Sequence, residues 1–163
     1  MNYIPIQDLD SGILLCDMNA KNLLKTAEFL FKKGDFGYSV GLAVISLEEY
    51  AKKIILLAKK NYPSMFENEV RDAFRNHNLK LEPALQLLMG GYPDSPPEDE
   101  IPRMAQYLGN KLVSLRLRGL YVDFYNGKWI SPQDEELKNM AEMQIQYNVD
   151  FFNKFDKWIN EMF

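Results

Sequence analysis

The chain has 163 residues, of which 47% are hydrophobic and 26% charged, and this is the composition of an ordinary globular protein and not of a disordered one. Such a length predicts a single domain over residues 1–163, with enough apolar side chains for a core. The net charge of −4 and the pI near 5.1 argue against a generic nucleic-acid coat protein, because such proteins present a broad basic face.

Apolar residues at helical spacing dominate the first part of the sequence. We expect an irregular N-terminal arm over residues 1–12 and a first helix over about 17–33. Gly34 is typical of a helix end, and Asp35 is a natural N-cap for a second helix over about 35–60. This second helix is apolar around most of its circumference, which predicts a central place in the fold.

The middle of the chain predicts shorter helices separated by turns. A third helix is expected over about 68–81, and Glu82-Pro83 starts a short one that runs to about residue 89. The glycine- and proline-rich stretch 90–97 is a predicted loop. A fourth main helix follows over about 100–120.

The last third of the chain predicts a hairpin and then one long helix. The Asn126-Gly127 pair lies between two short alternating segments, which indicates a small hairpin within residues 121–130. Ser131-Pro132 marks the start of a final helix to about Met162. Five main helices without an internal repeat predict an all-α helical bundle, with the hairpin as a small excursion.

The second predicted helix carries a cluster of charges inside an apolar stretch, namely Glu48, Glu49, Lys52 and Lys53. Glutamates four residues before lysines form favourable ion pairs on a helix. Such pairs are typical of a solvated surface, and this is one interpretation of the cluster. The other interpretation is that one carboxylate is half-buried, because its neighbours are apolar, and that it organises a functional site.

The only histidine of the chain is His77. Histidine is the side chain whose ordinary pKa suits proton transfer near neutrality, although a lone histidine is as often structural. Arg71 and Lys80 lie on the same segment. A histidine flanked by cations can bind and protonate a phosphate oxygen, so all three are candidate site residues. With one histidine per chain, a two-histidine mechanism requires a dimer.

Two arginines, Arg116 and Arg118, and the nearby Tyr121 form a third constellation near the end of the fourth main helix. Arginines at this place serve either to cap the helix or to clamp a phosphate. Capping is the simpler interpretation. Tyr121 lies five positions after Arg116, so the two would share a pocket only if the helix persists or bends.

No metal or cofactor is expected from the sequence. Cys16 is the only cysteine, so neither a disulfide framework nor a cysteine zinc site is predicted. We find no glycine-rich phosphate loop and no metal-ligand spacing. The apolar runs are too short for a membrane span and no secretion signal is evident, so we expect a cytoplasmic protein without a membrane partner.

Several segments together resemble the AbiV family of abortive-infection proteins, within the HEPN-like superfamily. They are Gly34-Asp35-Phe36, Ser46 to Lys52, His77 to Lys80, Arg116 to Asp123, Gly127-Lys128-Trp129 and Pro132. The most specific is Gly-Leu-Tyr-Val-Asp at residues 119–123. The resemblance implies a phage-defence protein that arrests translation or growth in infected bacteria. Asn78 stands where the family pattern has a lysine, and the late helix has no histidine.

The first hypothesis that follows is a metal-independent HEPN-type ribonuclease with RNA as its partner. His77 would be the acid or base, Arg116 and Arg118 the phosphate clamp, and Tyr121 a hydroxyl donor. Lys80 and Arg71 would add positive charge beside the histidine. The residues expected to orient these groups from the second helix are Glu48, Glu49 and Lys52.

The second hypothesis is a non-catalytic, homodimeric binding module that sequesters a phage or host translation protein. The acidic pI and the missing histidine of the late helix favour it. In a third interpretation the charged clusters only specify the fold, and the interaction surface lies elsewhere, for example on the 90–100 loop.

Overall fold

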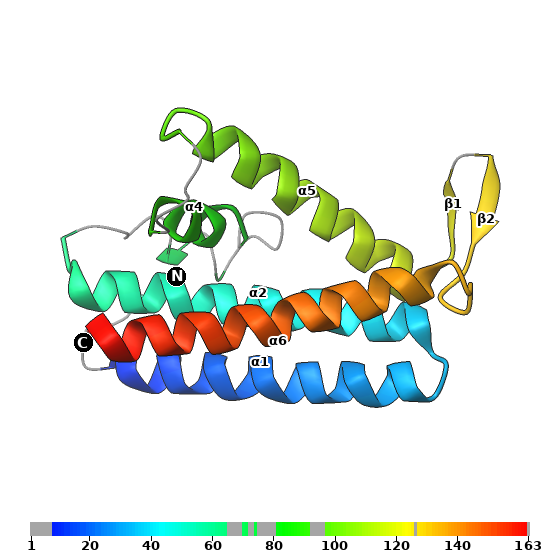
Figure 1. Cartoon of the computed structure of the whole chain (residues 1–163), viewed down its shortest axis with the longest axis horizontal. Coiled ribbons are helices and arrows are strands. Elements are labelled where there is room, and N and C mark those ends of the chain that lie inside the picture. The colour runs from blue at the N-terminus through cyan, green and yellow to red at the C-terminus, as the bar shows by residue number, and fades with distance from the viewer. Residues whose placement is uncertain are drawn as a thin grey trace. The chain divides into compact units, whose positions relative to one another are not determined.

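The computed structural model describes residues 8–64, 70–71, 74, 81–91, 97–125 and 127–162. Within these ranges the chain forms five helices with described limits and one two-stranded antiparallel hairpin (Figure 1). The elements are α1 (Leu9–Lys32), α2 (Phe36–Asn61), α4 (Leu81–Gly91), α5 (Ile101–Leu120), β1 (Asp123–Tyr125), β2 (Lys128–Ile130) and α6 (Leu137–Met162). The predicted all-α fold with a small hairpin is confirmed.

Two helix starts differ from the sequence predictions. The first helix begins at Leu9, so the expectation of an irregular arm was wrong for residues 9–12. Burial explains this, because Leu9 and Cys16 lie seven residues apart on one helix face and both are buried. The last helix begins at Leu137 and not at Ser131. Ser131 starts a turn instead, in which its backbone N–H donates to the Asp134 carboxylate at 2.9 Å.

The other boundaries agree with the sequence to within a few residues. Residues 70, 71 and 74 are helical, as predicted for the third helix, whose remaining residues lie outside the described ranges. The hairpin pairs Phe124 with Trp129 in the segment where the sequence predicts it. Gly127 lies in a turn and has a φ of +80°, and Asn126 lies outside the described residues.

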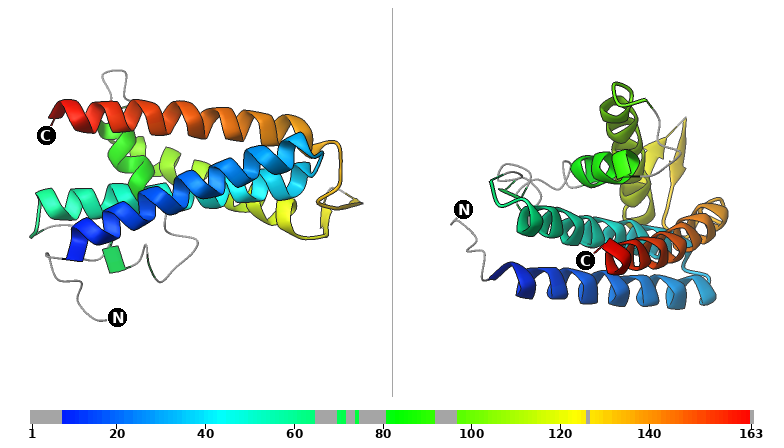
Figure 2. Two further views of the ribbon diagram at one scale, coloured as in Figure 1. Left: turned by 90° about the horizontal axis from the view of Figure 1, so that it is seen from below. Right: turned by 60° about the vertical axis from the view of Figure 1, so that its left-hand side comes forward.

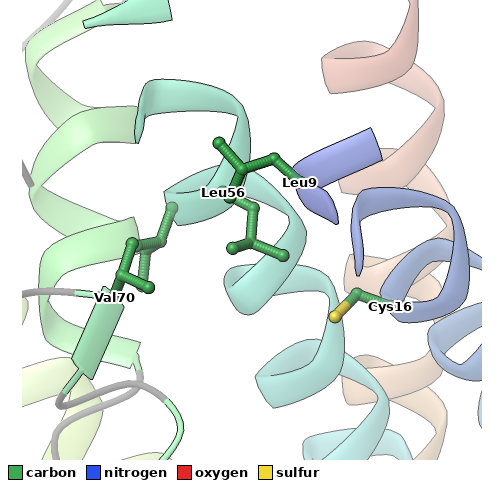
Figure 3. Close-up of a cluster of buried hydrophobic side chains, with 5 residues drawn as sticks. Leu9, Cys16, Leu56 and Val70 are labelled. Atoms are coloured by element: carbon green, nitrogen blue, oxygen red, sulfur yellow. The ribbon is translucent and has the colours of Figure 1, made fainter. Parts of the chain in front are cut away.

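The chain divides into two compact units, whose boundaries fall within α1, α2 and α5. Unit 1 comprises Met1–Ala20 and Glu48–Val113. Its described core joins the beginning of α1, the end of α2 and Val70 (Figure 3). The partly buried Phe74 packs against this cluster. The buried members of this cluster are Leu9, Cys16, Ile55, Leu56 and Val70.

Unit 2 comprises Lys21–Leu47 and Ser114–Phe163. Here α6 packs against the first half of α2 through Leu137 and Ala141, which contact Phe36 and Val40 (Figure 2). A buried hydrogen bond strengthens this contact, since the Asn148 amide donates to the Ala43 carbonyl at 2.6 Å. Figure 2 also shows the hairpin following the end of α5.

A glycine turn connects α1 to α2. The N–H of Asp35 donates to the carbonyl of Leu30, and the N–H of Gly34 donates to the carbonyl of Phe31, both at 3.0 Å. Gly34 has a φ of +84°. These are the two bonds and the left-handed residue of a Schellman motif, so the turn occurs where the sequence predicted it.

Candidate functional site

The charged cluster of α2 lies in unit 1 and is largely buried. Glu48 is 2% exposed and Lys53 is 7% exposed. These values contradict the interpretation of the cluster as a solvated helix face. An ionised group at this depth must be met by opposite charge or hydrogen bonds, because its desolvation costs several kcal/mol, on the order of the whole stability of a domain.

Lys53 obtains its counter-charge from α1. Its ammonium group lies 2.7 Å from the Asp17 carboxylate and 3.3 Å from the Tyr50 hydroxyl. The same ammonium lies 4.4 Å from the centre of the Tyr50 ring. Three groups on two helices therefore hold the lysine in one position. Asp17 and Tyr50 were not among the residues selected from the sequence.

A second cross-helix pair follows the same geometry near the ends of the two helices. Lys60 lies 2.6 Å from Asp10, and both side chains are substantially exposed. Asp10 and Asp17 are seven residues apart on α1, and Lys53 and Lys60 are seven apart on α2. Because the helices form an antiparallel hairpin around Gly34, each acid lies about as far before the turn as its lysine lies after it. This spacing was a readable signal in the sequence.

The remaining pair of the cluster lies on α2 itself. Glu49 and Lys52 form an ion pair of 2.6 Å at a spacing of three residues, not the expected four. The Lys52 ammonium also lies 5.2 Å from the centre of the Phe74 ring. Both side chains are less than one-sixth exposed. The cluster is thus a partnered network in unit 1, which favours the structural interpretation.

The arginine constellation lies in unit 2, at the end of α5. Arg116 and Arg118 are half-buried, and each makes polar or electrostatic contacts within the protein. Residues two positions apart point to nearly opposite sides of a helix. One phosphate is therefore not within reach of both guanidinium groups from this helix alone.

Tyr121 lies directly after α5 and its side chain is 62% exposed. Its N–H donates to the Leu117 carbonyl at 3.0 Å, so the helical bonding continues to this residue. Five helical positions correspond to a rotation of about 140°, so Tyr121 and Arg116 face different directions. The structure does not bring these two candidates together.

The hairpin and the residue that precedes it expose apolar side chains to very different degrees. Ile130 is 1% exposed, whereas its neighbour Trp129 is 73% exposed and Val122 is 64% exposed. Successive side chains of a strand point to opposite faces, which explains the contrast between Ile130 and Trp129. In the sequence this segment was notable for its predicted turn and for the family resemblance, and not as a binding surface, of which an exposed tryptophan is typical.

The remaining candidates, Arg71, His77 and Lys80, come from the segment between α2 and α4. His77 and Lys80 lie outside the described residues. Arg71 is helical and exposed, and it makes an interaction within the protein. Across the described part of the chain, no three histidine, cysteine or acidic side chains are arranged to hold a metal ion. None of the described helices is long and apolar enough to cross a bilayer.

The HEPN-like resemblance implies an all-helical fold, and the structure has one. The Glu-Glu-x-x-Lys segment lies within α2, and the Gly-Leu-Tyr-Val-Asp segment begins in the last turn of α5. The chain matches the HEPN family model described as AbiV over residues 8–152. This match covers most of the chain, and the protein belongs to the AbiV family. Membership indicates a role in abortive infection, a form of phage defence. No curated protein and no solved structure matches the chain.

Proposed function

We propose that this AbiV-family protein stops translation or growth in the infected cell by binding a protein of the phage or of the host translation machinery. The observation that carries the proposal is the apolar surface exposed at the hairpin, by Trp129 of β2 and by Val122, which directly precedes β1. Tryptophan and tyrosine dominate the binding energy of protein interfaces, and the exposed Tyr121 precedes this hairpin.

The burial of the α2 cluster supports the same conclusion. Glu48 and Lys53 have almost no exposed surface, and Lys53 is already held by Asp17. Neither residue therefore offers a free acid, base or cation to a substrate. In unit 2 the two arginines and Tyr121 face different directions around the helix axis. A surface for binding thus fits the described residues better than a set of converging catalytic groups.

The test is phage protection by the variant Trp129→Ala. Because Trp129 is mostly exposed, we expect the variant to fold normally and to lose most of the protection in plaque counts. Tyr107→Ala is the matched control, since Tyr107 is an aromatic residue of α5 that is 60% exposed. Undiminished protection by a folded Trp129→Ala protein, at equal expression, would refute the hairpin as the binding surface.

RNA cleavage is the second candidate function. It is favoured by the exposed Tyr121, a residue with a hydroxyl group that follows the two arginines of α5 by less than two turns. In this proposal His77 acts as the acid or base, and either Arg116 or Arg118 stabilises the phosphate charge. In the sequence the exposed Arg71 precedes His77 and Lys80 follows it, and both add positive charge near the histidine.

Sequencing of cellular RNA ends during infection distinguishes the two functions. Sequestration of a translation protein stops protein synthesis without new RNA ends, and the His77→Ala variant retains protection. Cleavage produces new ends at defined positions, and these disappear with His77→Ala. The thermal unfolding midpoint of the variant must equal that of the wild type for either result to count.

A further inference from the structure

Helix α1 exposes apolar side chains that none of the functions above uses. The exposed fractions of Leu14, Leu15, Met18 and Phe29 are 58%, 63%, 50% and 57%. With a rotation of about 100° per residue, these four positions fall within an arc of about 100° on the surface of the helix. Single exposed apolar residues are ordinary on a protein surface, but four within one narrow arc indicate a binding surface.

The same arc carries positive charge. Lys25 and Lys32 lie within it, and both are exposed. The exposed Lys33 directly follows the helix, and its N–H donates to the Phe29 carbonyl at 3.2 Å, so the helical bonding continues to this residue. Its ammonium group lies 5.6 Å from the centre of the Phe29 ring. The four apolar residues and these three lysines are here called the outer face of α1.

The acids of α1 lie on a different side of the helix. Asp10, Asp17 and Glu28 follow one another at intervals of seven and eleven residues, which are close to whole numbers of helical turns. Asp10 and Asp17 are paired with Lys60 and Lys53 of α2. Glu28, on the same line, is half-buried. No acid of α1 therefore lies within the outer face to balance its lysines.

We propose that the outer face of α1 binds the surface of an anionic lipid bilayer, with the helix parallel to the membrane plane. The apolar side chains enter the boundary between headgroups and acyl chains, and the lysines contact the lipid phosphates. The helix does not cross the bilayer, in keeping with the described helices, none of which is long and apolar enough to do so. The proposal revises the expectation of no membrane partner, which rested on the short apolar runs and the lack of a secretion signal.

The combination of side chains favours lipid over other partners. A single-stranded nucleic acid would use the lysines and stack on Phe29, but it would gain little from the aliphatic Leu14, Leu15 and Met18. Lysine is depleted from protein interfaces, so three lysines around one exposed ring do not favour a protein. A bilayer surface suits both kinds of residue, because lysine lays its stem along apolar surface and keeps its ammonium group at the phosphates.

The test is cosedimentation of the full-length protein with vesicles of phosphatidylcholine and phosphatidylglycerol, compared with vesicles of phosphatidylcholine alone. We expect binding to the anionic vesicles only, and weaker binding at higher salt, because salt screens the lysines. Lys25→Glu/Lys33→Glu should raise the apparent dissociation constant by at least about thirtyfold, since attraction is replaced by repulsion. Leu15→Gln/Met18→Gln should raise it by about tenfold, because less apolar surface enters the bilayer.

Two matched variants separate the outer face from general effects. Lys111→Glu/Lys154→Glu changes the net charge by the same amount, and Lys111 also lies near an aromatic ring, 5.3 Å from the centre of Tyr107. Leu117→Gln/Met143→Gln replaces an equivalent pair of apolar residues that are 43% and 73% exposed. Both variants should bind the anionic vesicles within about threefold of the wild type. Equal thermal unfolding midpoints confirm that all four variants are folded.

Three results would overturn the proposal. The first is a wild-type protein that does not sediment with the anionic vesicles, and the second is an equal loss of binding in the matched variants. The third is binding of single-stranded RNA that depends on Lys25 and Lys33 while vesicle binding does not, which would assign the face to nucleic acid. The measurement contains no phage or host protein, so its outcome is independent of what the hairpin binds.

Discussion

Lys53 is a charged residue in the interior of unit 1, and its position follows from what surrounds it. Its side chain is 9% exposed and that of Asp17 is 19% exposed, so water screens their interaction weakly. The 2.7 Å contact and the Tyr50 hydroxyl satisfy the ammonium group. Lys60 and Asp10 form the same kind of contact at the surface, with side chains 46% and 71% exposed. The two pairs differ mainly in burial, which makes them a natural comparison.

Removing one acid from each pair should therefore have unequal effects. Asp17→Ala leaves the buried Lys53 ammonium without its carboxylate, and we expect a loss of about 3 kcal/mol in the free energy of unfolding. Asp10→Ala should cost no more than about 0.5 kcal/mol, because exposed ion pairs contribute little. Urea denaturation of both variants measures the difference. Equal losses would show that Asp17 does not support Lys53 energetically.

At the scale of elements, the close approach of α5 to α2 in unit 2 depends on glycine. A Cβ atom on Gly119 would lie 2.4 Å from the backbone oxygen of Gly37 and 2.9 Å from the backbone nitrogen of Gly41. Backbone atoms cannot move aside as a flexible side chain can. The glycine of the Gly-Leu-Tyr-Val-Asp segment is therefore required for helix packing, which explains its place in that segment without any chemical role.

The substitution Gly119→Ala should separate these two helices and destabilise the protein by about 3 kcal/mol or more, in the range of other overpacking changes. Gly109→Ala in the same helix is the control, since the nearest atom to a new Cβ is 4.0 Å away. The control should be neutral or raise the stability by up to about 1 kcal/mol, because alanine favours helix. Thermal unfolding followed by circular dichroism measures both. A Gly119→Ala protein as stable as the control would contradict the packing argument.

A second glycine, Gly34 in the turn between α1 and α2, is needed for its backbone conformation, and its substitution should cost less stability. Gly34→Ala forces an alanine to adopt a φ near +84°, although no atom lies within 4 Å of the new Cβ. The expected loss is about 1 kcal/mol from backbone strain alone. Gly34→Asn should recover part of it, because asparagine tolerates this conformation better. Chemical denaturation of the two variants checks the order of stability, and an asparagine variant less stable than the alanine variant would be inconsistent with it.

For the whole molecule, the burial of the α2 cluster predicts that stability and defence are separable. The segment around Glu48 lies within the stretch that matches the AbiV family model, yet its described contacts are those of a supporting network. Defence should then depend on exposed surface, such as the hairpin face around Trp129.

Replacing Asp17 and Lys53 together by apolar residues tests this separation. The double variant Asp17→Leu/Lys53→Met removes both charges at once, so no buried ion is left without a partner, and stability should change by less than about 1.5 kcal/mol. Phage protection should persist at the wild-type level in plaque counts. Loss of protection in a double variant that remains folded would mean that the pair takes part in function directly.

The sequence by itself determined the helices, the glycine turn and the hairpin, because these depend on local spacing, proline and glycine. It also placed the protein in its family, through segments such as residues 119–123. It did not show that α1 begins at Leu9, because the apolar contact of Leu9 lies on residues far along the chain. Likewise, the sequence does not distinguish the adjacent Glu48 and Glu49, and only packing made Glu48 the more buried of the two. Tertiary structure alone decided how deeply the Lys53–Asp17 pair is buried and that the Tyr50 hydroxyl completes it, since burial is a property of neighbouring elements.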